Sequence, residues 1–178
     1  GNLQADLNNN KEAINLYDEG LKISSVDVNL LFNKGHALAN LEKYEEAIVW
    51  YDKVLAIDPK YVNALISKGL ALHNLEKYEE AIVCFDKVLA IDPKYVFALG
   101  NKGNALMELE KYEDAVASYD KAGSIDANDS LIWYNRGVAL SQLEQYDNAI
   151  LSYEKAIEVS PGYADAWYNK AELLKHKG

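Results

Sequence analysis

The stretch VNLLFNKGHALANLEKYEEAIVWYDKVLAIDPKY, residues 28–61, is followed directly by VNALISKGLALHNLEKYEEAIVCFDKVLAIDPKY, residues 62–95. The two stretches agree at 27 of 34 positions without a gap. The same register divides the rest of the chain into two full units and one partial unit at each end: residues 96–129, 130–163, 1–27 and 164–178. Self-similarity at one fixed period predicts a single repeat solenoid over residues 1–178 rather than an ordinary globular domain.

Within each repeat, the spacing of apolar and small residues predicts two helices. In the second full repeat one buried face runs from Ala64 to Leu75, and another runs from Ala81 to Ile91, where Pro93 stops it. Glycine recurs at one place in the first helix and alanine at one place in the second, so we expect the paired backbones to approach closely. We call the two helices A and B, and we number repeat positions 1–34 from Val28, Val62, Val96 and Ser130.

This pattern resembles the tetratricopeptide repeat, a helix–turn–helix unit with Trp or Leu, Gly, Tyr, Ala, Phe or Tyr, Ala and Pro at fixed places. The chain departs from it where Val54 and Val88 replace a small residue and where Ser25 and Ala127 replace the proline. The resemblance implies an all-α fold, a right-handed superhelical solenoid of antiparallel helix pairs with its A helices lining a concave groove. In the last full repeat the matching residues are Trp133, Gly137, Leu140, Tyr146, Ala149, Tyr153, Ala156 and Pro161.

Composition excludes several classes of function. With 28 acidic and 18 basic residues the net charge is −10, which disfavours binding to nucleic acid because phosphate binding needs Lys and Arg. The longest stretch without a charged residue has seven residues, for example Tyr61 to Ser67, so no membrane insertion is expected. The single cysteine, Cys84, cannot form an internal disulfide or a zinc site, and a reduced cytoplasm is the default compartment. We find no catalytic motif and no metal or cofactor motif, and we predict a protein that is not an enzyme.

The two ends of the chain suggest a piece cut from a longer protein. Gly1 falls at the position of the mid-helix glycine, so we expect the chain to begin inside a helix A. At the other end, Lys177 replaces a recurring leucine and Ala171 replaces the glycine, which suits a solvated capping helix. Gly178 instead falls where many related repeats carry a turn glycine, which suits a chain that continues, and the two alternatives stay open.

The face of helix A that does not enter the core is the candidate binding surface. Positions 2, 5, 6, 9 and 12 form one stripe, and four of the seven differences between the two most similar repeats lie on it. Because the equally exposed back of helix B is almost unchanged, we interpret this divergence as ligand recognition rather than drift. The stripe is nearly uncharged, which suits an apolar or aromatic peptide. Its candidate binding residues are Phe32, His36, Ile66, Leu70, His73, Phe97, Met107, Leu131, Tyr134 and Val138.

Asparagine recurs at position 6 of the stripe. A carboxamide has both a donor and an acceptor, so it pairs with a peptide unit whatever side chain that unit carries. A similar asparagine ladder holds extended peptide backbone in the O-linked N-acetylglucosamine transferase, and the resemblance implies the same role here. The alternative is an inter-repeat hydrogen bond that sets the pitch of the solenoid. The ladder consists of Asn33, Asn101, Asn135 and Asn169.

Two further features of helix A lead to predictions. Gly100 stands where the other repeats carry Phe32, Ile66 and Tyr134, so we expect a gap that receives an anchoring side chain. Position 7 is basic in every repeat. In one interpretation the side-chain stem packs between repeats and the charge reaches solvent. In the other, these residues form the edge of a groove that meets an acidic partner. The basic residues are Lys34, Lys68, Lys102, Arg136 and Lys170.

The predicted function is that of a non-catalytic module that binds an extended or helical, partly apolar peptide segment of a protein partner. Positions 2, 5 and 6 lack the Lys and Arg with which the chaperone-binding repeats grip a carboxylate, so chaperone C-terminal tails are not expected ligands. One alternative is a structural scaffold that forms homo-oligomers through the ends of the solenoid. A second is the substrate-recruiting arm of an enzyme whose catalytic domain lies outside this sequence.

Overall fold

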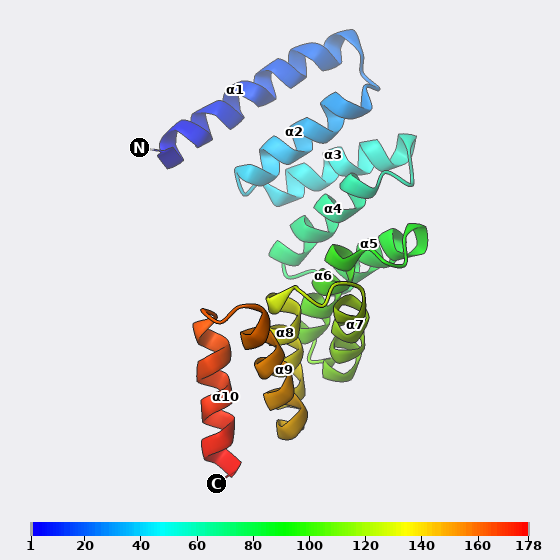
Figure 1. Ribbon diagram of the computed structural model, residues 1–178. Helices are drawn as coiled ribbons and strands as arrows, with labels where there is room; N and C mark the ends of the chain where they lie inside the picture. Colours follow the sequence, from blue (N-terminus) through cyan, green and yellow to red (C-terminus); the bar gives the residue numbers. More distant parts are fainter. Residues whose placement is uncertain (1, 178) are drawn as a thin grey trace. The chain divides into compact units, whose positions relative to one another are not determined.

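The computed structural model describes the backbone of residues 2–177 and the side chains of residues 8–176. Every regular element in this part of the chain is an α-helix, and the expected all-α fold of helix pairs is confirmed (Figure 1). None of the described helices is both long enough and apolar enough to cross a membrane. The chain divides into two compact units, residues 1–91 and 92–178.

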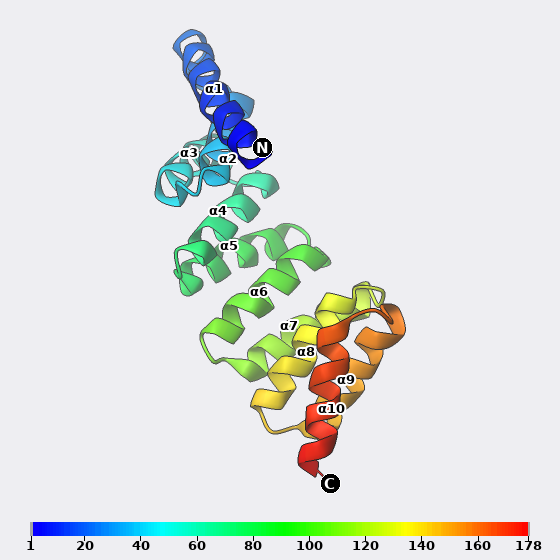
Figure 2. The same cartoon turned by 90° about the vertical axis from the view of Figure 1, so that its left-hand side faces the viewer.

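Each unit contains five consecutive helices, and consecutive helices pack on one another. Within the first unit α2 also contacts α4, and within the second α6 contacts α8, so neighbouring A helices lie side by side (Figure 2). The first unit comprises α1 (Asn2–Ile23), α2 (Val28–Asn40), α3 (Tyr44–Ile57), α4 (Val62–Asn74) and α5 (Tyr78–Ile91). The second comprises α6 (Val96–Glu108), α7 (Tyr112–Ile125), α8 (Ser130–Gln142), α9 (Tyr146–Val159) and α10 (Ala164–Lys177).

The turn between helix A and helix B has one conformation in all four full repeats. Its second residue is a glutamate with φ between 57° and 59°, in the left-handed region that usually favours glycine: Glu42, Glu76, Glu110 and Glu144. The next residue closes the turn by donating its N–H to a carbonyl of helix A, as from Lys77 to Leu72 at 2.9 Å. This turn satisfies the last carbonyls of helix A and folds helix B back onto it.

The small residues of helix A provide the room for the core, as the sequence predicts. A Cβ on Gly35, Gly69, Gly103 or Gly137 would lie 2.5–2.8 Å from a ring carbon of the aromatic residue at position 24 of helix B. These rings belong to Tyr51, Phe85, Tyr119 and Tyr153, and all four are at most 2% exposed. The glycines therefore let large aromatic rings lie directly against the backbone of helix A.

The basic ladder at position 7 forms ion pairs between repeats. Four of the five bases reach a carboxylate 16 residues earlier, on the preceding helix B: Lys34 with Asp18, Lys68 with Asp52 at 2.5 Å, Arg136 with Asp120 at 2.5 Å and Lys170 with Glu154 at 2.9 Å. The four basic side chains are only 10–23% exposed. The stems pack between repeats as predicted, but the charges are paired with carboxylates rather than left in solvent.

The first helix is continuous where the full repeats have a turn, and the prediction made from Gly1 falls outside the described residues. Residues 2–23 form one continuous helix, without a turn between the segments that correspond to A and B. In the full repeats helix B begins with a half-buried tyrosine such as Tyr44, which packs in the angle between the two helices. Asn10 stands at that position in the first repeat, so the residue that would fill the angle is missing. The predictions for the side chain of Lys177 and for Gly178 fall outside the described residues.

Candidate functional site

Two hollows open on the helix A face, one in each unit. The α2–α4 hollow has a volume of about 180 Å³ and is lined by His36, Ala39, Asn40, Tyr44, Tyr51, Ser67, Leu70, Ala71 and Asn74. The α8–α10 hollow has a volume of about 210 Å³ and is lined by Val138, Ser141, Gln142, Tyr153, Asn169, Glu172 and Leu173. Both hollows use positions 9, 12 and 13 of one helix A, position 24 of helix B, and positions 6, 9 and 10 of the next helix A. The two hollows therefore occupy equivalent places in two different repeats.

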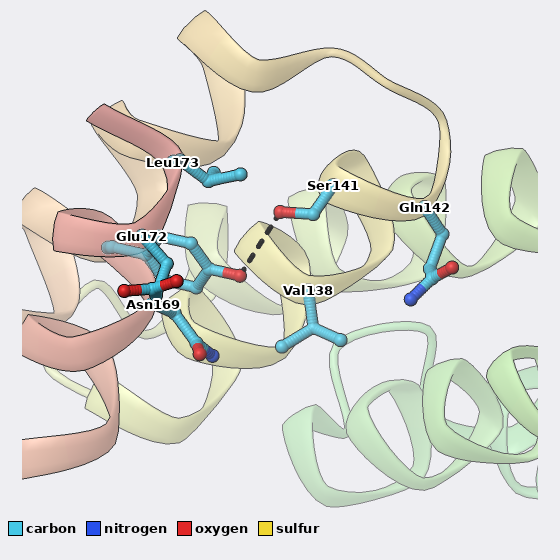
Figure 3. Close-up of a pocket in the computed structure, with 7 residues that line it drawn as sticks. Val138, Ser141, Gln142, Asn169, Glu172 and Leu173 are labelled. Atoms are coloured by element: carbon cyan, nitrogen blue, oxygen red, sulfur yellow. Dashed lines mark hydrogen bonds between the residues drawn. The ribbon is translucent and has the colours of Figure 1, made fainter. Parts of the chain in front are cut away.

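The floor of the α8–α10 hollow is polar but uncharged. The hydroxyls of Tyr153 and Ser141 lie 3.2 Å apart (Figure 3). Ser141 also donates to the Gly137 carbonyl at 2.9 Å. Burial raises the pKa of the Tyr153 hydroxyl, and its hydrogen bond with Ser141 opposes part of that shift. The floor thus keeps its phenol protonated at neutral pH and offers hydrogen-bonding groups to a ligand.

The walls of this hollow come from two helices. Figure 3 shows Val138 on α8 and Leu173 on α10 as its apolar walls, with Asn169 and Glu172 beside Leu173 on the same helix. Glu172 is a carboxylate at position 9, and with Asp165 at position 2 and Lys175 at position 12 the stripe, uncharged in the four full repeats, carries three charged residues in the last partial repeat. The hollow is suited to an apolar side chain whose neighbouring backbone has N–H groups to donate.

Between α6 and α8 the corresponding polar groups are paired with one another. The carboxamide oxygen of Asn104, at position 9, accepts hydrogen bonds from the Tyr119 hydroxyl at 2.7 Å and from Asn135 Nδ2 at 3.0 Å. The helix B tyrosine, the position 9 side chain and the next position 6 side chain form one network. This network links consecutive repeats on the helix A side.

The asparagine ladder has structural contacts at three of its four members. Asn135 donates to Asn104, and Asn169 donates to the Tyr134 hydroxyl at 3.1 Å, so both connect neighbouring repeats. Asn101 donates at 2.7 Å to the carbonyl of Phe97 on its own helix, whereas Asn33 is exposed. The inter-repeat hydrogen bond that the sequence left as an alternative is present at two positions, and a ligand role for the ladder stays a prediction.

The apolar stripe divides into exposed and packed positions. Phe97 and Leu131, at position 2, are each 50% exposed and are available to a ligand. The position 5 rings instead pack against the tyrosine at position 34, which directly precedes the next helix A: the Phe32 and Tyr61 ring centroids lie 5.6 Å apart, and those of Tyr134 and Tyr163 lie 4.9 Å apart.

Two residues at position 5 are more covered than the sequence suggests, and a binding role for Ile66 stays a prediction. Ile66 is only 9% exposed, so its side chain belongs to the packed interior rather than to the groove surface. Gly100 does not leave an open gap, because a Cβ there would lie 2.9 Å from the Cδ1 atom of Ile132. The glycine lets Ile132 of α8 pack against α6, and a larger side chain at residue 100 would meet it.

The remaining predicted residues lie at different depths. His36, Leu70 and Val138 line the hollows, and Met107 is half-buried on α6. His73 packs against the ring of Tyr78 with centroids 5.1 Å apart, and its buried Nε2 atom has no hydrogen-bond partner. Among the described side chains, no group of three or more His, Cys, Asp or Glu is placed to hold a metal ion.

Sequence reasoning missed the floor and the rim of the hollows. The floor tyrosines, Tyr51 and Tyr153, come from helix B and were not among the predicted binding residues. Position 13 contributes Asn40 and Gln142 to the rim, although it lies outside the stripe. A signal was present, because position 13 is polar in all four full repeats while positions 11 and 14 are always leucine.

The Tetratricopeptide repeat model matches residues 28–61, 62–95 and 130–163, more than half of the chain. The chain belongs to the tetratricopeptide repeat family. Two further models of this repeat match residues 103–144 and, in two segments, residues 84–117 and 152–178. A search of curated proteins finds no match.

Solved structures of several similar proteins share the fold. YrrB, described as a TPR protein with an unusual peptide-binding site, is 25% identical with a TM-score of 0.76, over 90% of this chain and 83% of that one. MamA from Desulfovibrio magneticus RS-1, residues 41 to the end, is 25% identical with a TM-score of 0.82, over 90% and 92%. The first TPR of Spaghetti (RPAP3), bound to the HSP90 peptide SRMEEVD, is 24% identical with a TM-score of 0.64, over 67% and 94%.

Proposed function

We propose that this chain is a non-catalytic interaction module that binds an extended or helical, partly apolar segment of a partner protein along its helix A face. The observation that carries the proposal is the pair of repeat-equivalent hollows, at α2–α4 and at α8–α10. Each has a volume of about 180 to 210 Å³, and a cavity of about 150 Å³ in another protein holds a benzene molecule. Each hollow therefore suits one leucine-sized or phenyl-sized side chain.

The chemistry of the hollows specifies the partner further. Their floors present tyrosine hydroxyls and a position 6 side chain, Ser67 or Asn169, which pair with the backbone of a bound segment. Half-exposed Phe97 and Leu131 add apolar contact area on the same face. The peptide-binding site named for YrrB, at 25% identity, supports this kind of ligand by analogy.

Two ligand classes do not fit. Positions 2, 5 and 6 carry no Lys or Arg in the four full repeats, so we do not expect chaperone C-terminal carboxylates to bind. The net charge of −10 makes nucleic acid an unsuitable partner. We propose a reducing compartment such as the cytoplasm, because the single cysteine, Cys84, is buried as a free thiol.

Displayed random and proteomic peptides selected on the immobilised chain test this function. We expect enrichment of peptides with spaced apolar or aromatic residues. The double variant Phe97→Ser, Leu131→Ser should bind an enriched peptide at least about tenfold more weakly, because apolar burial is lost at two half-exposed positions. Isothermal titration of the purified variants measures the change.

The matched control lies on helix B. Val83 and Leu151 are 53% and 61% exposed, so Val83→Ser, Leu151→Ser removes a similar apolar area from the other face. This control should bind the same peptide as the unchanged chain does. Equal weakening by both double variants, or no enrichment at all, contradicts binding on the helix A face.

A further inference from the structure

A larger pocket lies in the first unit between α1 and α3, over α2. Its volume is about 540 Å³, and we call it the α1–α3 pocket. Its walls come mainly from helix B side chains, including Ile14 of α1 and Trp50 of α3, together with Leu38 of α2. It shares no residue with the α2–α4 hollow, so it is a separate site that does not depend on the function proposed above.

Two of the lining residues depart from the repeat pattern. Position 23 holds Cys84, Ser118 or Ser152 in the later repeats, each at most 7% exposed, but in the first full repeat it holds the half-buried Trp50. Position 18 is acidic in all four full repeats, whereas the equivalent residue of α1 is Lys11. The other repeats adopt the same fold without a tryptophan at position 23 or a lysine at position 18, so the fold does not require Trp50 or Lys11.

The pocket has an excess of positive charge in an acidic protein. Lys34 pairs with Asp18, and Lys43 pairs with Glu46 at 2.8 Å, so these four charges balance. Lys11 forms no ion pair with any side chain of residues 8–176. One unbalanced ammonium group at the pocket attracts a carboxylate, and the attraction is stronger beside low-dielectric apolar walls than in open water.

Two lysine ammonium groups lie over the indole ring of Trp50. The ammonium of Lys34 lies 3.9 Å from the indole ring centroid, and that of Lys53 lies 3.6 Å from it. The indole also covers Lys34, which explains why this lysine side chain is 10% exposed while its counterpart Lys68 is 23% exposed. Lys11, Lys34 and Lys43 thus line the pocket, of which Lys34 and Lys43 are paired with carboxylates, and Lys53 lies over its Trp50 wall.

We propose that the α1–α3 pocket binds an acidic peptide segment in which apolar side chains lie next to a carboxylate. The apolar side chains pack against Ile14, Leu38 and Trp50, and the carboxylate pairs with Lys11. The pocket holds more than twice the volume of either hollow on the helix A face, so it accepts two or three side chains rather than one.

The probe is a displayed library of random 12-residue peptides, selected on the whole chain. Enriched peptides that depend on this pocket are expected to carry Asp or Glu beside apolar residues. Their dissociation constants should rise about tenfold in Lys11→Glu, which gives α1 the acidic residue of the other repeats, and stay unchanged in Lys11→Arg. Trp50→Ser, the residue of two later repeats, should also weaken binding about tenfold because it removes the aromatic wall.

Three controls separate this site from folding and from the helix A face. Thermal melts of Lys11→Glu should match those of the unchanged chain, because Lys11 is exposed. The helix A variant Phe97→Ser, Leu131→Ser should bind these acidic peptides normally, and raising NaCl should weaken the interaction. The proposal is overturned if no acidic peptide is enriched, or if the enriched peptides bind Lys11→Glu and Lys11→Arg equally well.

Discussion

Replacing Tyr119 with alanine is expected to lower the free energy of unfolding by about 3 to 5 kcal/mol, the cost of removing a buried aromatic side chain. Its ring is fully buried and lies against Gly103, where a Cβ would come within 2.5 Å of it. No neighbouring side chain can fill the space easily, because the backbone of helix A forms one wall of it. Urea unfolding followed by circular dichroism measures the loss.

Two control variants separate the contribution of the Tyr119 ring to the free energy of unfolding from that of its hydroxyl. Tyr119→Phe keeps the ring and removes only the hydroxyl that donates to Asn104, so we expect a loss of about 1 kcal/mol. Tyr168→Ala removes a tyrosine that is 66% exposed and should change stability by less than about 0.5 kcal/mol. If Tyr119→Ala costs no more than Tyr119→Phe, the packing of the ring under the glycine is not what holds the two helices together.

Raising the pH above 10 is expected to destabilise the fold through the same tyrosines. Burial raises the pKa of Tyr51 to about 12, although its hydrogen bond with Ser67 lowers it somewhat. Burial also raises the pKa of Tyr119 and of Tyr153. The unfolded chain releases these protons near pH 10 while the folded chain keeps them, so the stability present below pH 10 falls as the pH rises through the folded pKa values.

The loss from Tyr51 alone is about 2 to 3 kcal/mol between pH 10 and pH 12, because each pH unit contributes about 1.4 kcal/mol. The measurement compares unfolding free energies at pH 9 and pH 11.5. Phenylalanine already occupies this position in the second full repeat, as Phe85, so the triple variant Tyr51→Phe, Tyr119→Phe, Tyr153→Phe is a natural control. It should lose much less stability over this range, and an equally steep loss would show that other groups carry the pH dependence.

The sequence predicts well those structural features that depend on residues within one repeat. The period of 34, the helix pairs and the close approach at Gly69 follow from residues that recur in register, and the structure has them all. These features depend on packing within the repeat, because the helix A glycine leaves room for the large aromatic ring of helix B. The left-handed glutamates of the turn were not foreseen, since glutamate gives no signal for that conformation.

Features that depend on contacts between repeats were harder to predict. Ile66 was assigned to the groove because helical periodicity gives the direction of a side chain on its own helix but not what the neighbouring helix covers. Gly100 suggested a gap for the same reason, and Ile132 of another repeat fills it. The partners of the basic ladder could have been found, because each base is separated by 16 residues from a carboxylate in every repeat.

The most direct test of the helix A face as the binding surface is amide chemical-shift mapping with a peptide from the display selection. We predict the largest changes in the isotope-labelled chain at residues that line a hollow, such as Ser141 and Gln142 of α8 and Leu173 of α10. Amides near Leu151, on the exposed face of α9, should change little. Changes concentrated around Leu151, with α8 and α10 unaffected, would contradict the account.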